Sequence, residues 1–294
     1  LGQRALTLAP SAPSVLEEAA KSAFAADEED AGREALEELC RLPPVRGQAC
    51  LTLLIAERDR PGMIAEVVET DPTLTLALAE HLRQRGHDKA VTKVLTWAQD
   101  TFPNHLGVHE ALVASWIRTP GGLDVLDTLS VDILARSAEE SDEDTKRRMQ
   151  RLGYLVQGRI AERDGRYLEA RHLYQEAATL DPTRAVEPLL RAVKVLLRLD
   201  DLDRVERVLK QLYRAIEPKD RLSRVSYHRV HSTALMREGH LREAAAELHK
   251  AIRLSPKDYT LYERLGSVLA ALSDGRGAER AQKQASRLRG EPSP

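Results

Sequence analysis

The sequence predicts an all-α fold built from stacked helix–turn–helix units, and two observations support this prediction. The first is a regular series of helix stops, because prolines follow Ala- and Leu-rich stretches at steps of 31 to 38 residues over much of the chain. A step in the mid-thirties is that of two helices of about 14 residues with two short turns. The stops are Pro10, Pro44, Pro72, Pro103, Pro182, Pro218 and Pro256. The second is composition: of 294 residues 42% are hydrophobic but only 4% aromatic, which is typical of closely packed Ala/Leu helices.

The clearest unit covers residues 151–184. Its first helix places Gly158, and its second helix places Ala170, where two antiparallel helices would cross closely. Tyr174 is expected to fill the space beside this crossing. Pro182 cannot continue the second helix, so the chain must turn there.

This pattern resembles the tetratricopeptide repeat (TPR), and the resemblance implies a right-handed α-solenoid. The same frame falls on Ala244 in the next-to-last unit, and on Gly266 and Ala278 in the last one. About eight units fit the chain, and those in the N-terminal half are degenerate. The motif "DGRG" at 274–277 is expected to be the turn of the last unit.

The regularity of these units divides the chain into four parts. They are a degenerate TPR-like half at 1–130, an irregular or acidic insert or hinge at 131–150, four TPR repeats at 151–288 and a disordered tail at 289–294. The acidic stretch "EESDED" at 139–144 is expected to begin a solvated helix. Ser141 would cap this helix, and the acids would be favoured by the helix dipole.

No motif for catalysis is recognisable, so we expect neither enzyme activity nor a cofactor. The chain has no glycine-rich phosphate loop with a following Lys and Ser/Thr, and no Gly-x-Ser-x-Gly motif. Two histidine pairs, His105 with His109 and His228 with His231, could chelate a metal. Neither pair has a third ligand at a suitable spacing, and structural zinc sites use four. We therefore expect no metal site and assign these histidines to polar packing.

The only two cysteines, Cys40 and Cys50, lie on either side of one expected turn between neighbouring helices. A disulfide is possible if their Cα atoms come within about 7 Å. The alternative is a pair of buried thiols, because cysteine packs as a small hydrophobe. The localisation stays open between the cytoplasm and the bacterial envelope or periplasm, and a disulfide would favour the envelope.

Charge and hydropathy favour a protein partner over nucleic acid or membrane. The net charge of −2 gives no general attraction to nucleic acid or to an anionic surface. No run of eighteen apolar residues is present, so we expect no membrane-spanning helix. Ala5 and Pro10 are spaced like the end of a unit, so we expect the chain to begin inside a helix and to be part of something longer.

The TPR resemblance implies that the first helices of the units line a concave groove. The residues mapped to this groove in the C-terminal units are basic, with Leu and Met between the charges. They are Leu155, Arg159, Arg163, Leu190, Lys194, Arg198, Arg229, Met236 and Arg237. Such a groove suits a partner segment that is acidic with apolar anchors. The alternative is that the arginines pair with nearby acids such as Glu162 and Glu187 and only solvate the groove.

Two functions follow from the resemblance. The first is a non-enzymatic scaffold that binds an acidic and apolar segment of a protein partner, in a bacterial multiprotein assembly. The alternative is a helical accessory or regulatory domain, periplasmic or cytoplasmic, of a larger membrane-anchored protein for envelope biogenesis or glycan handling. Neither hypothesis fixes the oligomeric state.

Overall fold

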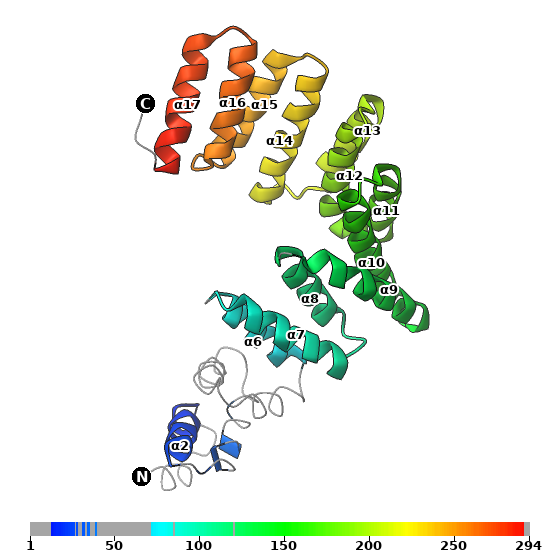
Figure 1. Ribbon diagram of the computed structural model, residues 1–294, viewed down its shortest axis with the longest axis vertical. Helices are drawn as coiled ribbons and strands as arrows, with labels where there is room; N and C mark the ends of the chain where they lie inside the picture. The colour runs from blue at the N-terminus through cyan, green and yellow to red at the C-terminus, as the bar shows by residue number, and fades with distance from the viewer. Residues whose placement is uncertain are drawn as a thin grey trace. The chain divides into compact units, whose positions relative to one another are not determined.

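The computed structural model describes residues 13–26, 28, 31–32, 34–35, 39, 72–84, 86–119 and 121–290. This part of the chain contains thirteen α-helices, one short 3-10 helix and no strand (Figure 1). The prediction of an all-α fold is therefore confirmed. The chain divides into two compact units, residues 1–126 and 127–294.

Four helices of the first unit are described. They are α2 (Pro13–Ala25), α6 (Pro72–Gln84), α7 (Asp88–Thr101) and α8 (Leu106–Arg118). Helices α6 and α7 pack as a pair, and α7 packs on α8. The next helix, α9 (Gly122–Glu139), contains the boundary between the two units.

The second unit consists mainly of four antiparallel helix pairs. They are α10 (Glu143–Arg163) with α11 (Tyr167–Leu180), α12 (Val186–Arg198) with α13 (Leu202–Ala215), α14 (Arg221–Arg237) with α15 (Leu241–Leu254), and α16 (Tyr259–Ala271) with α17 (Gly275–Arg289). The second helix of each pair contacts the first helix of the next one, as Figure 1 shows for α14 to α17.

Each of these pairs turns through one residue in the left-handed region, two positions before its second helix. Gly165 and Gly239 occupy this position with φ of 75° and 80°. In the other two pairs it is held by Asp200 at 57° and Ser273 at 62°. Conformations of this kind strain a residue that has a side chain. The turn of the last unit is therefore centred on Ser273, one residue before the expected "DGRG" motif, whose Asp274 caps α17 instead.

The cores of the pairs follow the expected pattern of small residues. Ala170 and Ala244 are fully buried, and Tyr174 is the largest fully buried side chain among the described residues. One apolar cluster runs from α10 through α13 to Val230 and Ala234 on α14, and another joins α14, α15, α16 and α17. Burial of these faces, rather than helix propensity alone, stabilises the stack.

The segment at 131–150 was expected to be an irregular or acidic insert or hinge, and most of it is helical. Residues 131–150 are helical except at Glu140–Asp142, the break between α9 and α10. Asp142 caps α10 by accepting a bond from the backbone N–H of Thr145, so Ser141 is not the cap. Asp142 directly precedes the first residue of α10, which is the position from which a side chain accepts from the N–H groups of the first turn. The hinge remains a prediction.

Two other expectations concern the ends of the described ranges. Cys40 and Cys50 lie outside the described residues, as do 291–294 of the expected tail. Arg289 is the last residue of α17, and Gly290 ends this helix in the left-handed conformation.

Candidate partner-binding surface

Polar side chains link the first helices of neighbouring C-terminal pairs, α10 with α12 and α14 with α16. Arg159 on α10 pairs with Glu187 on α12 at 3.4 Å, and in return Arg191 on α12 pairs with Glu162 on α10 at 3.4 Å. Further along, Arg264 on α16 donates to the hydroxyl of Thr233 on α14 at 3.3 Å. These bonds place polar positions of successive first helices on one surface.

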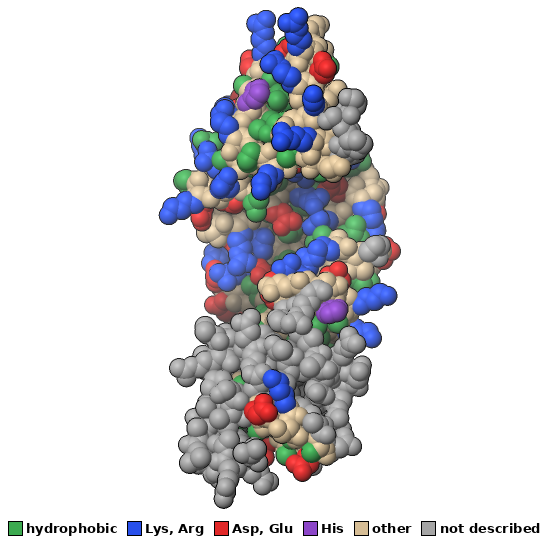
Figure 2. All heavy atoms as spheres, turned by 90° about the vertical axis from the view of Figure 1, so that its left-hand side faces the viewer, with side chains coloured by type: hydrophobic (Ala, Val, Ile, Leu, Met, Phe, Trp, Pro, Cys, Tyr) green, Lys and Arg blue, Asp and Glu red, His purple; other side chains and the backbone are tan. Residues whose placement is uncertain are grey.

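Five cations follow this surface across four helices, and we call them the basic strip. They are Arg159, Arg191, Lys194, Arg229 and Arg264. Figure 2 shows Lys and Arg side chains gathered in a hollow of the C-terminal unit, with acidic side chains among them.

The members of the basic strip lie close enough to affect one another's ionisation. Desolvation lowers the pKa of Lys194, and the charges of Arg191 and Arg229 lower it further. Desolvation and then Arg229 lower the pKa of Arg264 in the same way. Lys194 and Arg229 therefore connect the α10–α12 half of the strip to the α14–α16 half.

Acidic side chains pair with only part of the strip. Glu162 and Glu187 form ion pairs with it, and the charge of Asp258 acts on Arg264. Within the described part of the chain, the side chains of Lys194 and Arg229 make no hydrogen bond or ion pair. Lys194 and Arg229, at the centre of the strip, are therefore its two members without such a partner, whereas Arg159, Arg191 and Arg264 each have one.

The structure separates the six cations expected in the groove into two groups. Arg159, Lys194 and Arg229 belong to the basic strip. The other three lie at the ends of their helices and have local partners: Arg163 pairs with Asp164 at 2.8 Å, Arg198 lies 5.7 Å from the ring centre of Tyr167, and Arg237 pairs with Asp200 at 3.4 Å. Pairing with acids, the alternative interpretation of these arginines, therefore describes Arg159, Arg163 and Arg237. It does not describe Lys194 or Arg229.

The apolar residues expected in the groove differ in their exposure. Leu190 is half-buried and Met236 is 37% exposed, so both can contact a partner. Leu155 is only 4% exposed and belongs to the core around α10 to α13. Its side chain therefore supports the surface from beneath.

Sequence reasoning missed Arg191 and Arg264. The mapping carried the groove positions of the TPR family onto three C-terminal units, which gave Arg159 on α10 but not Arg191 on α12, and it did not include α16. In α12 and α16 the strip is supplied by Arg191 and Arg264, which contact Glu162 and Thr233 on neighbouring first helices. A count of all basic residues on the first helices would have included both.

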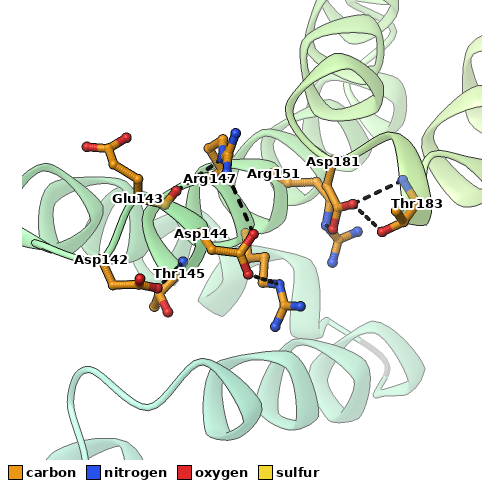
Figure 3. Close-up of polar contacts among 9 residues, drawn as sticks. Asp142, Glu143, Asp144, Thr145, Arg147, Arg151, Asp181 and Thr183 are labelled. Carbon is orange, nitrogen blue, oxygen red and sulfur yellow. Dashed lines mark hydrogen bonds and ion pairs between the residues drawn. The ribbon is translucent and has the colours of Figure 1, made fainter.

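The acidic residues at the start of α10 cap this helix or pair with its arginines (Figure 3). Asp142 accepts from the N–H of Thr145 at 2.8 Å, and Asp144 pairs with Arg148 at 3.2 Å. Nearby, Arg151 lies 4.0 Å from Asp181, which also accepts from the N–H of Thr183. These contacts cap and pair the segment, as expected for a solvated helix start.

The histidines considered as chelators have structural roles. His105 caps α8, and buried His109 bonds the carbonyl of Pro103 at 2.7 Å. His228 contacts the buried carboxylate of Glu247 at 2.6 Å, and His231 lies 3.3 Å from the same oxygen. Among the described residues, no group of three ligating side chains is arranged to hold a metal ion.

A separate recess lies in the N-terminal unit, between α7 and α8. It has a volume of about 700 Å³, and its walls include Trp97 and Trp116, the two tryptophans of the chain. Thr92 and Ser115 bond across it at 2.9 Å. Its charged margin is mixed, with Lys93 and Asp100 both lining it, so it does not share the uniform sign of the basic strip.

No helix within the described ranges is both long and apolar enough to cross a membrane.

Comparison with known proteins identifies the type of fold. Neither a protein-family model nor a curated protein matches the sequence. A tetratricopeptide repeat protein from Parabacteroides merdae superposes with a TM-score of 0.54 at 14% identity, covering 94% of this chain and 93% of that one. A chain of the APC/C hetero-tetramer Cut9–Hcn1 superposes with a TM-score of 0.53 at 19% identity, covering 90% of this chain and 47% of that one. These two superpositions confirm a TPR-like solenoid.

Proposed function

We propose that this TPR-like chain is a non-enzymatic scaffold whose basic strip binds an acidic segment of a protein partner. The observation that carries the proposal is the pair Lys194 and Arg229, two cations at the centre of the strip that have no ion-pair partner in the described part of the chain. The bacterial assembly expected from the sequence remains a prediction.

The strip would act first through its long-range field. The chain as a whole has a net charge of −2, so the positive strip is a local feature rather than a general one. A concentrated positive surface speeds the capture of acidic partners, and salt weakens this effect.

Apolar contacts would then hold the captured segment. Met236 and half-buried Leu190 lie on α14 and α12, the same helices that carry Arg229 and Lys194. Apolar side chains that lose water on binding supply much of the affinity of an interface, while charges at its edge mainly steer. A segment with acids and one or two large apolar side chains fits both features.

A peptide selection tests the proposal and does not require an identified partner. Random peptides of about twelve residues, long enough to lie along a groove, would be selected on the protein at low and at moderate salt. We expect enrichment of Asp and Glu together with Leu, Ile, Phe or Met, and weaker selection at moderate salt. Enrichment of basic peptides, or of acidic peptides that bind a Lys194→Glu, Arg229→Glu variant equally well, would contradict the proposal.

A further inference from the structure

We infer that Arg191, Lys194 and Arg229 form a phosphate-binding point within the basic strip, and that its ligand is a phosphoserine or phosphothreonine side chain of the partner segment. This inference rests on the proposed function, because it specifies the chemistry of the acidic group that the strip binds.

Charge balance is the first argument. Lys194 and Arg229, at the centre of the strip, are its two members without a hydrogen-bond or ion-pair partner in the described part of the chain. A phosphate monoester carries a charge of about −1.5 to −2 near neutral pH, so one group would balance both cations. A single Asp or Glu side chain would leave one of them uncompensated.

The placement of the three cations is the second argument. Arg191 and Lys194 are three residues apart on α12, so they share one face of this helix. Arg229 lies on α14, which packs directly against α12, and its charge lowers the pKa of Lys194. A group bound here would be approached from two helices, which suits the three acceptor oxygens of a phosphate better than the two of a carboxylate.

The acid that pairs with Arg191 is also bonded to a second side chain. Glu162 accepts a bond from the hydroxyl of buried Tyr174 at 2.8 Å and pairs with Arg191 at 3.4 Å. It therefore holds one edge of the Arg191 guanidinium. The five N–H donors of a guanidinium leave another edge for a phosphate.

Small probes can test this point on the full chain. N-acetyl-phosphoserine amide and N-acetyl-glutamate amide would be titrated at pH 7.5 and constant ionic strength, while NMR follows the side-chain signals of the lysines. We expect the phosphoserine probe to shift the Lys194 signal and to bind at least fivefold more tightly than the glutamate probe. The bound phosphate should also raise the pKa of Lys194 measured in a pH titration, because its negative charge favours the protonated ammonium and opposes the desolvation and the neighbouring cations that lower this pKa.

Matched variants assign the binding to these residues. Lys194→Gln and Arg229→Gln should each weaken phosphoserine binding at least tenfold, whereas Lys210→Gln on α13, a paired surface lysine, should not change it. Equal affinity for the two probes, or unchanged binding by Lys194→Gln, would overturn the inference. If acidic peptides still bind in that case, the proposed function holds without a phosphate site. If they also fail to bind, both are wrong.

Discussion

The ring of Tyr174 lies directly against the backbone of Gly158. A Cβ atom placed on Gly158 would be 2.6 Å from Cε1 of this ring, closer than carbon atoms pack. Tyr174 is fully buried, and its hydroxyl donates to Glu162, so the ring cannot move aside easily. This contact fixes how closely α10 and α11 cross, and through Glu162 it also supports the basic strip.

We therefore expect Gly158→Ala to destabilise the protein by about 1–3 kcal/mol, as overpacking of a tight core does. Gly266→Ala is the matched control at the equivalent position of the last pair. There the nearest atom to the new Cβ would be Cγ of Gln282, at 3.2 Å, and this flexible side chain can shift. Since alanine favours a helix by about 1 kcal/mol over glycine, Gly266→Ala should be neutral or stabilising. Thermal melts that rank the two variants in the opposite order would contradict this register of the repeats.

The left-handed turns provide a second prediction. Ser273 has a φ of 62°, in a position that two other pairs give to glycine. Ser273→Gly should stabilise the protein by about 0.5–1 kcal/mol, the relief of backbone strain less the entropy that glycine adds to the unfolded chain. Gly239→Ala should instead destabilise the protein, because Gly239 has a φ of 80°, which strains a residue with a side chain. Its Cβ would meet no atom within 4 Å, so any loss in a denaturant titration reports the backbone alone. If the two substitutions change stability in the same direction, the turns are not equivalent.

A third prediction concerns the loss of stability at low pH. Burial alone would raise the pKa of Glu247, but bonds from His228, His231 and Lys250 outweigh this and lower it below its usual range. A carboxyl whose pKa is lower in the folded state stabilises the fold above its unfolded pKa of about 4.3, and this contribution is lost as the pH falls further. Glu247→Gln should therefore cost about 1–3 kcal/mol near pH 7. The difference from the parent should shrink below pH 4 in urea titrations, and a difference that is constant with pH would show that the carboxylate charge plays no part.

The fold was accessible from the sequence because it depends on local and repeated features. Two features recur with the period of the repeat: prolines at the ends of helices, and small residues such as Ala170 and Ala244 at helix crossings. The prolines stop a helix, and the small residues let two helices pack closely. The turn at Ser273 escaped this reasoning because serine at a left-handed position has no sequence signal of its own.

The candidate partner-binding surface could be predicted from the sequence only in part. The pattern identified which helices face it, and it found Arg159, Lys194 and Arg229. It could not identify Arg191 or Arg264, because their orientation depends on Glu162 and Thr233 from other helices. The exposure of an apolar residue such as Leu155 also depends on how deeply neighbouring helices pack, which periodicity does not determine.

A fourth prediction concerns the phosphate point and salt together. Each contact between a cation and a phosphate is screened, so binding of the phosphoserine probe should weaken steadily between about 0.05 and 0.5 M salt. Met236→Ala should leave the binding of this small probe unchanged while weakening a longer acidic peptide with an apolar anchor, because Met236 offers only apolar contact. Isothermal titration of both ligands on this variant checks the division of roles, and an equal loss for both would contradict it.

The central claim is that the basic strip captures an acidic partner segment, and one comparison of charge reversals tests it most directly. The test variant carries Lys194→Glu and Arg229→Glu, and the control carries Lys210→Glu and Arg207→Glu on the exposed face of α13, so the net charge changes equally. Binding of a selected acidic peptide would be measured by fluorescence anisotropy at about 0.1 M salt, where exposed charges still act over about 10 Å. We predict at least a tenfold loss of affinity for the test variant and less than a twofold change for the control. Equal affinities of the two variants would show that the strip is not the binding surface.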